Sequence, residues 1–171
     1  MDSTSKAEME SYFACKNVRE RNARLTRLVL ECPDGAGEFF AEVFRKERLL
    51  PMKLAALRGF AHDADEQEVT VLAEHLLSLV RNYPIHAPYA YQPYEVMRSA
   101  FLLPYLVKTY GYPCFTALQK QVEQQYQALP DCFKGIFTCN ERGAHISLKD
   151  PQIASKEIRV FLDTQGVKTE S

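Results

Sequence analysis

Apolar side chains recur every three to four positions along most of this sequence, and no other feature constrains the fold as strongly. The clearest example is the segment 69–83, in which Val69, Leu72, Ala73, Leu76, Val80 and Tyr83 form one stripe and Val71, Leu77 and Leu79 add apolar surface on the other side. Side chains with this spacing share one face of an α-helix. Similar stripes occur in the segments 22–32, 39–48, 94–103, 115–129 and 153–162. The pattern predicts an all-α protein whose helices pack through their apolar faces.

Prolines and capping residues divide these stripes into separate helices. Asp65 and Glu68 have the spacing of a capping box, so we expect a helix to begin there. The segment 83–93 has three prolines, which predicts a loop. A helix is expected to resume near Tyr94, and Pro104 is expected to kink it by removing one backbone hydrogen bond.

The C-terminal third is less regular. Alternating apolar residues near 136–148, interrupted by a turn-like segment, predict one short β-hairpin. A last helix should follow, and residues 164–171 form a polar C-terminal tail. The chain has 171 residues, a length typical of one domain, so we expect residues 1–171 to form a single α-helical domain.

Two parts of the chain have a similar order of signals. Leu49-Leu50-Pro51 and Leu102-Leu103-Pro104 each precede a glycine, a long amphipathic segment and a further proline. Each part is typical of a helical hairpin. Over residues 38–130 the chain therefore resembles short HEAT-like α-α repeat proteins, which implies stacked helical hairpins. An irregular helical bundle is the alternative.

Charge and cysteine content exclude several classes of protein. The net charge is −1, with 21 basic and 22 acidic residues, so the chain has no global attraction to nucleic acid or to anionic membranes. Five cysteines without a CxxC motif are typical of neither a disulfide framework nor a zinc knuckle. Reduced cysteines favour a cytoplasmic protein, and no apolar run is long enough to cross a bilayer. Nothing in the sequence indicates a cofactor.

His62-Asp63 invites comparison with the metal-dependent phosphohydrolases of the HD type, which are also all-helical. Such a site needs several His and Asp ligands around one metal, yet no histidine precedes His62. We interpret these residues as part of a solvated loop before the next helix. A small helical hydrolase with a metal near His62, Asp63 and His86 is the enzymatic alternative.

Other catalytic patterns are weak. The sequence has no Gly-rich phosphate loop, no GxSxG and no HExxH. Cys114, at a predicted helix start, is the best placed thiol, and we interpret it as a packing residue. We therefore expect a protein that is not an enzyme.

The N-terminal region is locally basic. Its basic residues are Lys16, Arg19, Arg21, Arg24 and Arg27, which could contact phosphates or an acidic partner. Arg21, Arg24 and Arg27 give a nucleic-acid-binding alternative. Glu20 and Glu31 interrupt this cluster, so we favour a solvated helix face.

The segment 83–94 has the most unusual composition in the chain, because tyrosines alternate with prolines. Tyrosine offers a large, stiff contact surface with a hydroxyl group, which suits recognition of a partner. One alternative is that these rings pack over the core. Another is a small-molecule pocket in which His86 and tyrosine hydroxyls orient a ligand. On the recognition hypothesis, the anchors are Tyr89, Tyr91, Tyr94 and Arg98, and the polar rim is His86, Asp63, Asp65 and Glu66.

These observations favour protein–protein recognition. In size and helical character the chain resembles small bacterial immunity proteins, which implies that it binds and occludes a cognate toxin domain. The expected partner is thus another protein. The sequence does not indicate an oligomeric state.

Overall fold

The computed structural model describes residues 3–83 and 91–166. Of these residues 71% are helical, and the only strands among them form one antiparallel pair, which confirms the all-α prediction. The elements are α1 (Ser3–Tyr12), α2 (Val18–Glu31), α3 (Gly37–Lys46), α4 (Leu50–Asp63), α5 (Glu66–Arg81), α6 (Tyr91–Met97), α7 (Leu103–Tyr110), α8 (Pro113–Gln127), the 3₁₀ turn η1 (Asp131–Phe133), β1 (Phe137–Cys139), β2 (His145–Ser147) and α9 (Pro151–Thr164). No helix in the described ranges has both the length and the apolar character needed to cross a membrane.

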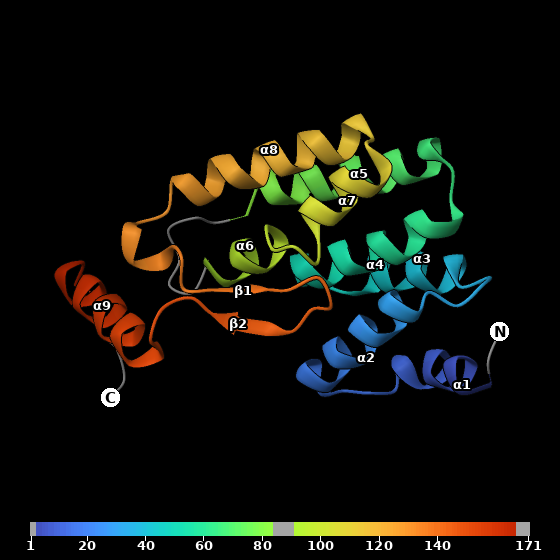
Figure 1. The fold of residues 1–171 in the computed structure, drawn as a ribbon, viewed down its shortest axis with the longest axis horizontal. Helices are drawn as coiled ribbons and strands as arrows, with labels where there is room; N and C mark the ends of the chain where they lie inside the picture. The colour runs from blue at the N-terminus through green and yellow to red at the C-terminus, as the bar shows by residue number, and fades with distance from the viewer. Residues whose placement is uncertain (1–2, 84–90, 167–171) are drawn as a thin grey trace.

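Helix α4 is the central element of the fold (Figure 1). It packs against α2, α3, α5 and α6, and its residues 52–59 are all buried. The helix can approach α3 closely because Gly59 lacks a side chain: a Cβ there would lie 2.7 Å from the ring of Phe40. The buried stretch includes two charged side chains, Lys53 and Arg58, which donate hydrogen bonds to the backbone carbonyls of Phe44 and Phe101.

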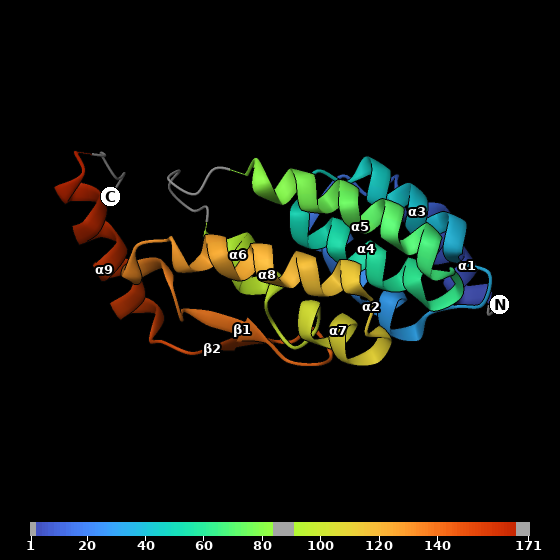
Figure 2. The same ribbon diagram turned by 90° about the horizontal axis from the view of Figure 1, so that it is seen from above.

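A second layer is formed by α5, α7 and α8, in which α8 packs on both of the other helices (Figure 2). The two predicted helical hairpins are present as α4 with α5 and α7 with α8. Their first helices differ in length, with 14 residues in α4 and eight in α7. That the two hairpins are repeats of one unit stays a prediction.

The hairpin predicted near 136–148 is confirmed. Phe137 pairs with Ser147, and Cys139 pairs with His145. Helix α9 follows and packs on η1, where the rings of Phe133 and Phe161 meet edge to face at 5.5 Å. This helix lies at the opposite end of the molecule from α1 (Figures 1 and 2). Thr164, expected in a tail, belongs to α9, and 167–171 lie outside the described residues.

The helix boundaries follow local chemistry. Asp65 accepts a hydrogen bond from the Glu68 backbone N–H at 2.9 Å, and Glu68 accepts one from the Asp65 N–H at 3.0 Å, which confirms the capping box. The expected kink at Pro104 is wrong, because α6 ends at Met97 and a new helix begins at Leu103. Pro104 lies in the first turn of α7, where a missing N–H costs nothing.

Candidate binding groove

An open groove of 920 Å³ runs between α2 and the start of α4 on one side and α6 with the hairpin on the other; we call it the central groove. Its lining residues are Val18, Arg19, Asn22, Thr26, Leu49, Pro51, Met52, Ala55, Gln92, Pro93, Val96, Phe101, Leu102, Phe137, Cys139, Gly143 and His145. Ligand sites in proteins have comparable volumes and mostly apolar linings. The central groove is therefore the candidate functional site among the described residues.

The first turn of α2 forms part of one wall. Asn17 caps this helix by accepting a hydrogen bond from the Glu20 backbone N–H at 2.9 Å, so the helix begins at Val18. Arg19 and Asn22 are three positions apart and lie on the same helix face. Both are exposed and line the groove, and Val18 keeps 44% of its surface exposed.

The start of α4 completes that wall. Leu49 occupies the N-cap position, where it makes no side-chain capping bond, and it is 49% exposed. Met52 and Ala55, one and two turns further on, are buried and line the groove below it. Pro51 in the first turn fixes where the helix begins. The exposed Leu49 at the rim of the groove is thus followed by the buried apolar residues Met52 and Ala55 at its floor.

The hairpin supplies the opposite wall. Successive side chains of a strand point to opposite faces, so Phe137, Cys139 and the cross-strand His145 share one face, which lines the groove. The rings of Phe137 and His145 stack with centroids 4.6 Å apart. Burial raises the pKa of the Cys139 thiol.

The turn of the hairpin reaches α2 at Gly143, which has a φ of +80°. A Cβ at this position would lie 2.7 Å from Cγ2 of Thr26 on α2. Glycine therefore satisfies two requirements here, the left-handed backbone and the close approach to the helix.

A buried carboxylate attaches the hairpin to the helices. Glu95 of α6 is 2% exposed and accepts hydrogen bonds from the backbone N–H of Ile136 at 3.1 Å and from the hydroxyl of Tyr126 at 3.3 Å. The Tyr126 hydroxyl in turn accepts one from the Gly135 N–H at 2.7 Å. Burial raises the pKa of Glu95, and these hydrogen bonds and the nearby Arg98 only partly oppose it.

The predicted anchors lie in different surroundings. Tyr94 is fully buried, and its hydroxyl accepts a hydrogen bond from the Gln125 amide at 3.3 Å, so its ring offers no surface to a partner. Arg98 stacks 3.8 Å from the ring centre of Tyr126 and pairs with Glu123 at 2.8 Å. Tyr91 is the first residue of α6. Tyr89 and His86 lie outside the described residues.

The described residues of the predicted polar rim, Asp63, Asp65 and Glu66, lie at the turn between α4 and α5 and not at the central groove. Asp63 contacts the ring of His62 at 3.0 Å, Asp65 caps α5, and Glu66 is exposed in its first turn. Among the described residues no group of three or more His, Cys, Asp or Glu side chains could hold a metal ion. The third ligand of the hydrolase alternative, His86, is outside them.

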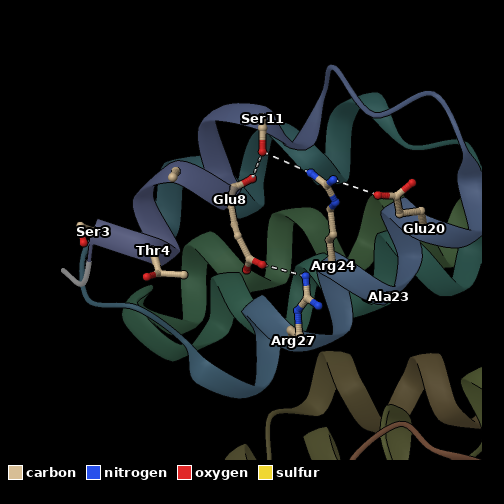
Figure 3. A pocket seen from close by; sticks show the side chains of 9 residues that line it. Ser3, Thr4, Glu8, Ser11, Glu20, Ala23, Arg24 and Arg27 are labelled. Carbon is tan, nitrogen blue, oxygen red and sulfur yellow. Dashed lines mark hydrogen bonds and ion pairs between the residues drawn. The ribbon is translucent and has the colours of Figure 1, made fainter.

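The three basic residues of the nucleic-acid alternative each pair with a carboxylate. Arg21 pairs with the buried Glu47 at 2.6 Å. Figure 3 shows the other two between α1 and α2, where Arg24 pairs with Glu20 at 2.9 Å and Arg27 with Glu8 at 2.7 Å. Their charges are thus largely neutralised within the chain.

Sequence reasoning missed the groove residues Val18 and Leu49, and it placed Arg19 only in the basic N-terminal cluster. The available signal was small: Leu49 stands at an N-cap position, where a polar residue is more usual, and Val18 follows the polar cap Asn17. No known protein family, curated protein or solved structure matches this chain. Function is therefore inferred from the chemistry of the groove itself.

Proposed function

We propose that this protein is a protein-binding module and that its central groove holds an apolar segment of a partner. The observation that carries the proposal is the exposure of Val18 and Leu49, at 44% and 49%, on one wall of a groove with an apolar floor. Exposed apolar side chains gathered at a concave surface are typical of interaction sites. Other exposed apolar residues, such as Val71 and Val160, do not line this groove.

The gain expected from covering the two rim side chains can be estimated. Each exposes about half of its surface, and complete burial of a Val or Leu side chain is worth about 1.5–3 kcal/mol. Covering both should contribute about 2 kcal/mol, which corresponds to about 30-fold in Kd. Replacing these two side chains together should therefore change Kd by an amount that a binding titration can measure.

The test uses peptides of about twelve residues selected from a random phage-displayed library on the full-length chain. Synthetic copies are titrated by fluorescence polarisation against the wild type, the V18S/L49S variant and a control variant, V71S/V160S. Serine is favourable at the N-cap position of Leu49, and Val18 is an exposed residue of the first turn of α2, so folding should be retained in thermal melts. The control exchanges two residues that are 66% and 55% exposed.

We expect V18S/L49S to bind the peptides about 30-fold more weakly and the control variant to bind like the wild type. Equal binding by all three proteins would contradict the proposal. So would a selection that returns only peptides whose nuclear magnetic resonance footprint lies away from the groove.

An immunity-type inhibitor that occludes a toxin is the narrower form of this proposal. It is supported by size and helical character alone. Its test is co-expression with a toxin-like protein encoded by a neighbouring open reading frame. We expect the wild-type chain and V71S/V160S to restore growth and V18S/L49S not to restore it. If all three proteins restore growth, the groove is not the surface that inhibits the toxin.

A further inference from the structure

The central groove has a positive but no negative side chain in its lining. Among the described residues that line it, Arg19 is the one permanent cation, and Asp and Glu are absent. Two further exposed arginines, Arg48 and Arg142, adjoin the lining residues Leu49 and Gly143. Of the acidic neighbours in the sequence, Glu47 and Glu20 pair with Arg21 and Arg24, and Glu141 is exposed beside Arg142. A charged group that enters the groove would thus be favoured if it is negative.

Arg19 differs from the other arginines of α2. Arg21, Arg24 and Arg27 all form ion pairs with carboxylates. In the part of the chain that the structure describes, the side chain of Arg19 makes neither a hydrogen bond nor an ion pair. The cation that faces the groove is therefore the one that is left available to a ligand.

The surroundings of Arg19 suit a carboxylate. Its planar guanidinium can donate two parallel hydrogen bonds to the two oxygens of such a group. The amide of Asn22 lies one helical turn away on the same face and can donate a further one. Val18, on the same turn, and Leu49 offer apolar contact next to this polar end.

We infer that the occupant of the central groove is an acidic amphipathic segment of another protein, with apolar side chains on Val18 and Leu49 and a carboxylate on Arg19. This inference rests on the proposed function and deepens it, because it names the chemistry of the partner. Arg19 is then the residue that selects among apolar segments by their charge.

The experiment repeats the phage selection on three full-length proteins: wild type, R19E and the control R159E. Arg159 is an exposed arginine of α9 and does not line the groove. Glutamate is favourable in the first turn of α2, so R19E should stay folded. Peptides selected on wild type and R159E should combine Asp or Glu with Leu, Ile or Phe, and those selected on R19E should carry Lys or Arg in place of the acids.

A peptide pair makes the measurement quantitative. Changing the selected peptide's Glu to Gln should weaken binding to the wild type about tenfold and leave binding to R19Q nearly unchanged. The inference is overturned if the Glu-to-Gln change has the same effect on both proteins, or if R19E selects peptides as acidic as those of the wild type.

The V18S/L49S variant distinguishes failure of the charge assignment from failure of the proposed function. If it loses the peptides while R19E selects the same acidic sequences, the groove binds apolar segments and only the assignment of their charge is wrong. If V18S/L49S keeps full affinity, the groove is not the binding site and the proposed function fails as well.

Discussion

Replacing Glu95 by Gln should stabilise the protein at neutral pH, although the residue is buried and hydrogen-bonded. The Gln carbonyl can still accept the hydrogen bonds from the Ile136 N–H and the Tyr126 hydroxyl. It carries no charge, however, and burial is the dominant influence on Glu95, whose pKa it raises. The ionised carboxylate is therefore a net cost to the folded state, and E95Q removes that cost.

The sign of the pH dependence follows from linkage. Because the pKa of Glu95 is raised, the folded protein binds the proton of this carboxyl group more tightly than the unfolded chain does. The contribution of Glu95 to the free energy of unfolding therefore falls as pH rises from the pKa of the unfolded chain to that of the folded protein. Below the unfolded value, about 4.3 for Glu, the group is protonated in both states and the cost vanishes. The advantage of E95Q should thus shrink as the solution is acidified.

Replacing Glu95 by Ala should have the opposite effect. The Ile136 N–H and the Tyr126 hydroxyl would both lose their acceptor, and a buried unsatisfied donor costs about 1–3 kcal/mol. We expect E95A to lower the free energy of unfolding by about 2–4 kcal/mol.

Urea unfolding followed by circular dichroism measures both variants between about pH 4 and pH 7.5. E74Q, which changes an exposed glutamate of α5, is the control and should follow the wild-type profile. The reasoning is refuted if E95Q is less stable than the wild type at neutral pH, or if the difference between them is the same at every pH.

Two further changes test other parts of the groove walls. R21M should lower the free energy of unfolding by about 3 kcal/mol, because the buried Glu47, 5% exposed, would lose its ion pair and keep its 2.7 Å hydrogen bond from Tyr12. In urea unfolding, adding E47Q to R21M should restore part of this loss. If the losses of the two single variants simply add, the two residues are not coupled. G143A should lower the free energy of unfolding by about 1–3 kcal/mol, because the alanine would have a φ of +80° and its Cβ would lie 2.7 Å from Thr26. Thermal melts should show a lower melting temperature for G143A. The control G37A, whose Cβ would meet no atom within 4 Å, should melt like the wild type.

Local patterns were sufficient to predict the helices. Spacing of three and four identified the stripe of α5, and the pair Asp65 and Glu68 identified its start, because both signals act within one or two helical turns. Pro104 shows where such reasoning fails. A proline can either kink a helix or begin one, and the sequence near it does not decide between them.

The groove could not be predicted in the same way, because its walls come from distant parts of the chain. Val18 and His145 line one cavity, yet no local spacing relates a residue of α2 to one of β2. Tyr94 illustrates the second difficulty. A tyrosine side chain suits a surface anchor and a core position equally well. In the core, the hydroxyl of Tyr94 is satisfied by a hydrogen bond from Gln125, 31 positions away in the sequence.

The two walls of the groove are held in place by separate interactions, and this bears on how a partner would bind. The hairpin wall is attached through Glu95, which bonds the backbone at Ile136. The opposite wall is fixed by the contacts of α2 with α4 and by the ion pair of Arg21 with Glu47 at the end of α3. Neither set of contacts needs an occupant. A partner segment would therefore meet a groove already formed, and the main entropic cost of binding would be the ordering of that segment.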